Sequence, residues 1–97
     1  MLNSRQRAQL RGMANDYETI LHIGKSGITE NTIVQAREAL EARELIKISV
    51  LQNCMDDPRE IAQILAERTH SQVVQVIGKK IVLYKEGKDK KKKIFLP

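Results

Sequence analysis

The chain has 97 residues, of which 41% are hydrophobic and 30% are charged, and its formal net charge is +5. This length and apolar content suit one globular domain. No apolar run approaches the roughly 20 residues of a membrane-spanning helix. The single cysteine, Cys54, cannot form an internal disulfide, and the two histidines are not part of a zinc-ligand spacing. We therefore expect a reduced, cytoplasmic protein that needs no metal or cofactor and acts as a monomer.

The charge is distributed unevenly along the chain. Residues 1–27 carry four basic and two acidic side chains. Residues 28–71 carry five basic and eight acidic ones, and residues 72–97 carry eight basic and two acidic ones. Two basic ends thus flank an acidic middle, which predicts a molecule with two different faces. The basic part is suited to a polyanion, and the acidic part to solvent or a partner.

A first helix is predicted over residues 3–15, with Asn3 or Ser4 as its cap. The i, i+3, i+4, i+7 spacing gives it a buried stripe of Leu10, Met13, Ala14 and Tyr17. Arg7 and Arg11 lie one turn apart and off this stripe, so we expect both to face solvent.

A loop bracketed by glycines, Gly24-Lys25-Ser26-Gly27, follows a strand predicted over residues 19–23. Glycine tolerates a positive φ and lets another backbone approach closely. The helical pattern that begins at Thr29 would aim N–H groups and a partial positive charge at the same place. The loop therefore indicates contact with a phosphate backbone. Taken alone, it is explained equally well as an ordinary strand-to-helix turn with a solvated lysine.

The same loop contains the Gly-Lys-Ser end of a nucleotide-binding P-loop. That motif needs a further glycine five residues before Gly24, where this chain has Thr19. His22 and His70 have no nucleophile or third ligand suggested near them, and no pair of carboxylates is set for acid–base work. We therefore expect no enzymatic activity.

The middle of the chain predicts a second helix, a strand and a third helix. The second helix is capped by Thr29 and has a core stripe of Ile33, Ala36 and Leu40, with Glu38, Glu41 and Arg43 outside. The strand, over residues 45–51, has one apolar face of Ile46, Ile48 and Val50. The third helix begins with Asp57 as cap, Pro58 at the first position and Glu60 in a capping box, and its apolar face is Ile61, Ile64 and Leu65.

Two β-rich runs, 72–77 and 81–85, are joined by Gly78-Lys79-Lys80 and predict a hairpin. The element order is α-β-α-β-α-β-β, which predicts a single compact α/β domain with helices packed on a mixed four-stranded sheet. We assign residues 1–87 to this domain. Residues 88–97 form a lysine-rich tail that is expected to add non-specific attraction to RNA.

The chain resembles the CRM domain (chloroplast RNA splicing and ribosome maturation), most closely its stand-alone bacterial, YhbY-like members. The stretches that carry the resemblance are residues 7–14, 23–29, 40–47 and 78–85. The family fold is similar to the C-terminal domain of translation initiation factor three and to KH domains, whose glycine loop clamps backbone nucleotides. The resemblance implies binding of structured rRNA in precursors of the large (50S) ribosomal subunit. Two positions depart from the family pattern, Glu18 in place of a common proline and Lys85 in place of a frequent arginine.

The predicted RNA-binding residues are the glycine loop and a basic platform around it. They are Gly24, Lys25, Ser26 and Gly27 in the loop, and Arg7, Arg11, Lys79, Lys80 and Lys85 in the platform. The alternative is an adaptor protein, in which the acidic second helix docks a ribosomal protein or a processing factor through Glu38 and Glu41.

Overall fold

The structure is a computed structural model that describes residues 2–86, so the tail predicted over residues 88–97 lies outside the described part. Its helices and strands follow the predicted order. They are α1 (Ser4–Ala14), β1 (Leu21–Ile23), α2 (Glu30–Arg43), β2 (Leu45–Val50), α3 (Pro58–Thr69), β3 (Gln72–Ile77) and β4 (Lys80–Tyr84).

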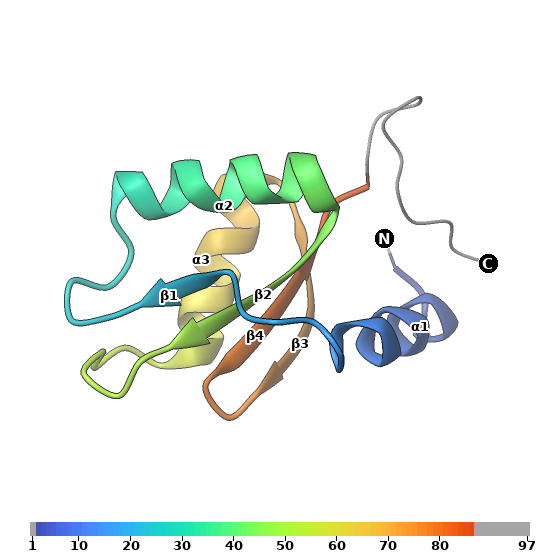
Figure 1. The fold of residues 1–97 in the computed structure, drawn as a ribbon, viewed down its shortest axis with the longest axis horizontal. Helices are drawn as coiled ribbons and strands as arrows, with labels where there is room; N and C mark the ends of the chain where they lie inside the picture. The colour runs from blue at the N-terminus through green and yellow to red at the C-terminus, as the bar shows by residue number, and fades with distance from the viewer. Residues whose placement is uncertain (1, 87–97) are drawn as a thin grey trace.

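The four strands form one mixed sheet in the order β1-β2-β4-β3. Strand β1 is parallel to β2, and β4 is antiparallel to both β2 and β3. Strands β1 and β2 therefore end where β4 begins and β3 ends. The loop after β1, the loop after β2 and the β3–β4 turn lie at this end of the sheet, which runs from the left of Figure 1 to the bottom of the view. The predicted fold class, an α/β domain with a mixed four-stranded sheet, is confirmed.

The sheet is covered differently on its two faces. Helices α2 and α3 cover one face and enclose the larger core, to which β2 contributes Ile46, Ile48 and Val50. Helix α1 packs on part of the other face, and its Leu10 and Ala14 join a smaller core with Leu45 of β2. The alternating side chains of one central strand thus build both cores.

Helix α1 is held more tightly than its sequence suggests. Asn3 caps the helix in a reciprocal capping box with Gln6. Of the two predicted caps, Asn3 and Ser4, the structure thus has Asn3. The expectation that Arg7 faces solvent is wrong: its side chain is half-buried, and its Nη1 donates to the carbonyl of Val73 in β3 at 2.5 Å. Arg11 is exposed, as predicted.

Helix α3 and strand β1 differ from their predictions in detail. Asp57 caps α3, as predicted, and its side chain accepts a hydrogen bond from the N–H of Arg59 at 2.9 Å. In the predicted capping box the donor would be the N–H of the next residue, Glu60. Ile64 is not in the core and is 45% exposed, because α3 buries Ala62 and Ala66 beside its other apolar residues and so turns Ile64 outward. Strand β1 begins at Leu21 rather than at residue 19.

A buried carboxylate and a buried phenol lie together at the far end of the sheet from the glycine loop. Glu44, between α2 and β2, is fully buried with a φ of 65°. Tyr84, at the end of β4, is 2% exposed. Burial, followed by the nearby charges of Glu44 and Glu86, raises the pKa of Tyr84 above its usual value of 10.0.

This raised pKa predicts a loss of stability at alkaline pH. Above about pH 10 the unfolded chain ionises Tyr84 while the folded chain keeps it neutral, so the folded state binds more protons. The free energy of unfolding should then fall as pH rises, by up to about 1.4 kcal/mol per pH unit from this group, until the folded pKa is passed. Urea denaturation of wild type and Tyr84→Phe between neutral and alkaline pH measures the difference. Tyr17→Phe is the control, and an equal slope in wild type and Tyr84→Phe would contradict the prediction.

Candidate nucleic-acid interface

The glycine loop is a tight turn whose tip faces solvent. The N–H of Gly27 donates to the carbonyl of Gly24 at 2.9 Å, which closes a four-residue turn. Lys25 and Ser26 occupy its two central positions and are both exposed. Gly27 has a φ of +66°, a conformation that favours glycine. The loop therefore presents one ammonium and one hydroxyl at the end of the sheet.

The loop after β2 packs directly against the glycine loop. A Cβ on Gly27 would lie 3.0 Å from Asp56 Oδ2, and one on Gly24 would lie 3.4 Å from Asn53 Oδ1. Neither neighbour is near these glycines in the sequence. Gly27 thus serves two purposes, the turn itself and the close approach of a second loop, whereas a side chain at Gly24 would make an ordinary van der Waals contact with Asn53.

On the α3 side of the glycine loop lies a groove of about 270 Å³. Its lining residues are Ser26, Ile28, Asp56, Glu60, Ile61 and Ile64. The side chains of Asp56 and Glu60 are exposed, so their negative charges repel a phosphate that approaches from this side. These two carboxylates therefore make the α3 side of the loop less favourable for a polyanion than the opposite side.

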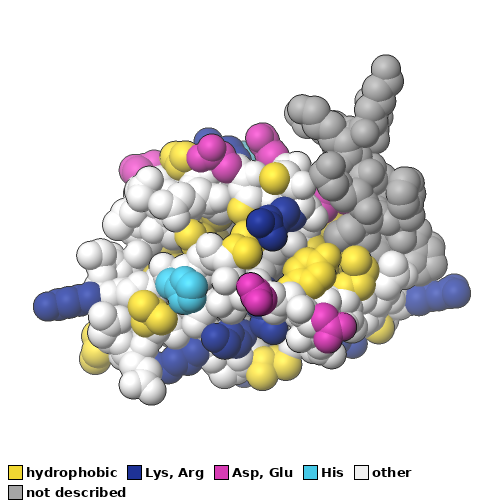
Figure 2. Space-filling model, in the orientation of Figure 1, with side chains coloured by type: hydrophobic (Ala, Val, Ile, Leu, Met, Phe, Trp, Pro, Cys, Tyr) yellow, Lys and Arg dark blue, Asp and Glu magenta, His cyan; other side chains and the backbone are white. Residues whose placement is uncertain are grey.

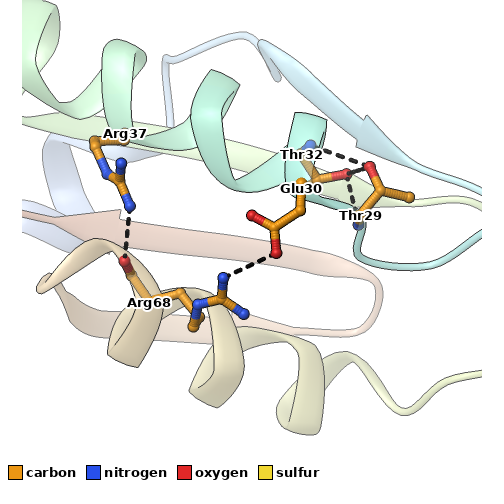
Figure 3. A network of polar contacts seen from close by, with 5 residues as sticks. All are labelled: Thr29, Glu30, Thr32, Arg37 and Arg68. Carbon is orange, nitrogen blue, oxygen red and sulfur yellow. Dashed lines mark hydrogen bonds and ion pairs between the residues drawn. The ribbon is translucent and has the colours of Figure 1, made fainter.

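The N-terminus of α2 is less available to an anion than the sequence suggested. Thr29 caps the helix and accepts from the N–H of Thr32 at 3.2 Å. Glu30 places a carboxylate in the first turn, where it stabilises the positive end of the helix, and pairs with Arg68 of α3 at 3.0 Å (Figure 3). Lys25 is therefore the main positive charge at this loop.

The β3–β4 turn brings two more lysines to the same end of the sheet. The turn is made by Gly78, with a φ of +56°, and Lys79, whose carbonyl accepts from the N–H of Val50 at 2.7 Å. Lys80 belongs to β4 rather than to the turn, and its Nζ donates to Ser49 Oγ at 3.1 Å. Because β4 begins where β1 ends, Lys79 and Lys80 share this end with Lys25.

The remaining residues of the predicted platform lie elsewhere. Lys85 follows the last residue of β4 at the opposite end of the sheet, where its N–H donates to the carbonyl of Glu44 at 2.9 Å. Arg7 and Arg11 are on α1, which lies far from the glycine loop along the longest dimension of the molecule (Figure 1). The predicted platform is thus two separate groups of cations.

Charged side chains of both signs are exposed on the face of the molecule shown in Figure 2. Figure 2 shows several acidic side chains along the top of the view, over α2, with a basic one among them, and more basic side chains in the lower part, where two acidic ones also lie. Glu38 and Glu41 of α2 are both exposed. Within residues 2–86, no group of three or more metal-ligating side chains comes together, and none of the helices has the length and apolarity to cross a membrane.

Comparison with known sequences identifies the family. The family profile of the CRS1/YhbY (CRM) domain matches residues 2–85. The chain belongs to this family. Over 97 residues, all of both chains, it is 50% identical to YqeI of Bacillus subtilis, which is named a probable RNA-binding protein. A protein of Haemophilus influenzae named RNA-binding protein is 29% identical over 93% of this chain and 91% of its own length.

A solved structure supports the fold directly. The solution structure of the protein SAV1595 from Staphylococcus aureus is 50% identical, covers the whole of both chains and superposes with a TM-score of 0.83. The predicted resemblance to the CRM domain is therefore confirmed.

Two residues of this region escaped the sequence-based prediction. Asp56 and Asn53 carry no motif of their own, and their contacts with the glycine loop depend on how β1 pairs with β2. The sequence indicated only the glycine side of these contacts, because paired glycines are a known sign of close backbone approach. Nothing in the sequence indicates that the carboxylate beside Gly27 belongs to Asp56.

A pair of glycine variants tests the geometry of the loop. Gly27→Ala should lower the free energy of unfolding by about 1–2 kcal/mol because the positive φ is strained for alanine. The new methyl group would also meet Asp56 at 3.0 Å. Gly12→Ala is the matched control: Gly12 is exposed within α1 and has nothing within 4 Å of its Cβ position, so alanine should stabilise the protein by about 0.5–1 kcal/mol.

Urea denaturation measures both variants. The double variant Gly27→Ala/Asp56→Ala separates backbone strain from the carboxylate contact, because it removes only the second. Equal stabilities of Gly27→Ala and wild type would contradict the proposed geometry.

Proposed function

We propose that this chain is a non-enzymatic RNA-binding protein that holds structured RNA by its backbone. The observation that carries the proposal is the convergence of Lys25, Lys79 and Lys80 at one end of the sheet. Family membership and the names of its relatives support RNA as the polyanion.

In this proposal the glycine loop lies against the sugar-phosphate chain. Lys25 pairs with a phosphate and the Ser26 hydroxyl donates to a phosphate oxygen, both from the exposed tip of the turn. Lys79 and Lys80 extend the contact along the same end of the sheet. Such contacts position an RNA by phosphate and shape and read little of its base sequence.

The acidic groups around the site give this contact a direction. Asp56 and Glu60 disfavour RNA on the α3 side of the loop, and Glu38 and Glu41 disfavour it over α2. RNA is thereby directed to the face that carries α1. The exposed face of α2 is left to solvent or to a protein partner, the adaptor role considered from the sequence.

Arg11 and Lys85 lie too far from the loop to share one phosphate with it. They contribute in this proposal only where the RNA is long enough to follow the sheet toward α1. Arg7 already donates to Val73, so its first role is to hold α1 in place. The resemblance to YhbY-like proteins points to rRNA of the large subunit as the target, bound during assembly until maturation proceeds.

Charge reversal at the loop and hairpin tests the interface. Lys25→Glu/Lys79→Glu should weaken binding to a labelled rRNA hairpin by at least about tenfold at ~150 mM salt. The slope of log Kd against log salt should also fall by roughly one per lost phosphate contact. Fluorescence anisotropy gives both values, and circular dichroism checks folding.

The matched control reverses the same charge at the other end of the sheet, Lys85→Glu with Arg43→Glu. These two residues are not near the glycine loop in the fold. An equal loss in both double variants would mean that net charge, not the position of the lysines, determines binding, and the proposed site would be wrong.

The assembly role has its own measurement. In cell extract separated on a sucrose gradient, the wild-type protein should sediment with precursors of the large subunit, and Lys25→Glu/Lys79→Glu should remain near the top. Sedimentation of wild type with mature small subunits, or with no ribosomal particle, would contradict the rRNA target without affecting the RNA interface itself.

A further inference from the structure

One row of side chains crosses the sheet next to the glycine loop, with one residue from each strand. His22 of β1 pairs with Ser49 of β2, Ser49 pairs with Lys80 of β4, and Lys80 pairs with Ile77 of β3. Directly paired residues point to the same face of a sheet. We call these four residues the sheet row.

The sheet row faces away from α2 and α3. The neighbours of its members along the strands, such as Leu21, Ile48 and Ile81, belong to the core under those helices, so the row itself lies on the opposite face. Helix α1 shares this face but covers another part of it, since its core contains none of the four residues. His22 and Lys80 are exposed, and Ile77 is 62% exposed.

The row is continuous with the glycine loop. His22 is two residues before Gly24, and the N–H of Leu51 donates to the carbonyl of Ile23 at 2.8 Å. Lys80 Nζ donates to Ser49 Oγ, which holds its ammonium over the sheet. The carboxylates of Asp56 and Glu60 lie on the other side of the loop. An RNA strand that leaves the loop is therefore directed onto the row.

The chemistry of the row suits unpaired nucleotides better than a duplex. An imidazole ring and an exposed isoleucine offer surfaces on which base faces pack, and lysine offers a partner for phosphate. A duplex stacks its bases internally and presents mainly phosphates and riboses, so it gains nothing from Ile77. Four strands span about 14 Å, which is room for a short run of nucleotides.

We propose that the sheet row binds unpaired nucleotides adjoining the paired RNA that the glycine loop holds, so that the protein recognises a junction between a helix and a single strand. This inference rests on the proposed function and adds a substrate class to it. It explains why an apolar side chain as large as Ile77 is left exposed beside Lys79 and Lys80.

The test compares three RNAs with the full-length protein. One is a labelled blunt hairpin, and the other two are the same hairpin with a short oligouridine extension at its 5′ end or at its 3′ end. Wild type should bind one of the extended RNAs about tenfold more tightly than the blunt hairpin. His22→Ala/Ile77→Ala should lose this gain while its affinity for the blunt hairpin stays unchanged.

Val34→Ala/Ile64→Ala is the matched control, because these side chains are each 45% exposed but lie on α2 and α3. This variant should keep the full gain from the extension. No gain in wild type, a gain retained in His22→Ala/Ile77→Ala, or a gain lost in Val34→Ala/Ile64→Ala would each overturn the inference.

Lys25→Glu separates this inference from the proposed function. It should weaken binding of blunt and extended hairpins by the same factor, leaving the gain from the extension intact. If Lys25→Glu changes neither affinity while His22→Ala/Ile77→Ala abolishes the gain, the sheet row stands and the loop assignment fails. If wild type binds neither RNA, the proposed function fails and the inference with it.

Discussion

The pairing register of β2 is the constraint on which the rest of this structure depends. β2 lies between β1 and β4, and its alternate residues supply both cores: Ile46 and Ile48 face α2 and α3, whereas Leu45 faces α1. A shift of one residue would exchange these faces and expose the larger core. The same register fixes where β1 ends and where β4 begins. The register of β2 therefore places the glycine loop and the hairpin lysines at the same end of the sheet.

This arrangement concentrates positive charge at one end of the molecule at little cost to folding. Lys25 and Lys79 are exposed in turns, so solvent screens their mutual repulsion. The carboxylates of Asp56 and Glu60 lie on the α3 side of the glycine loop that carries Lys25. They reduce the overall attraction for a polyanion, but they make one direction of approach better than the rest. Orientation is what a protein that reads shape rather than base sequence requires.

The sequence predicts correctly the caps and buried faces that depend on local periodicity. It does not predict which distant residues lie together, because that depends on the order and direction of the strands. The buried stripe of α2, its Thr29 cap and the apolar face of β2 follow from local spacing and are correct. The sequence-based prediction places Lys85 in one platform with Lys25, which requires the hairpin to lie beside the loop along its whole length. Only the antiparallel pairing of β4 with β2 shows that they lie at opposite ends. The expectation that Arg7 faces solvent failed for a similar reason, since its partner Val73 is 66 residues away and no local pattern connects them.

The exposed end of β3 combines two requirements that usually conflict. An edge strand with free apolar surface invites pairing with another chain, and nearby lysines are a common protection against this. Here Lys79 lies in the turn that follows Ile77 and Lys80 is the first residue of β4, so their charge opposes the approach of a second copy to this edge. In the proposed interface the same charge attracts RNA, whose phosphates pair with the lysines and whose bases pack on the isoleucine. One arrangement of side chains in this interface thus opposes edge-to-edge pairing and suits a single-stranded polyanion, which would account for an apolar residue that remains exposed there.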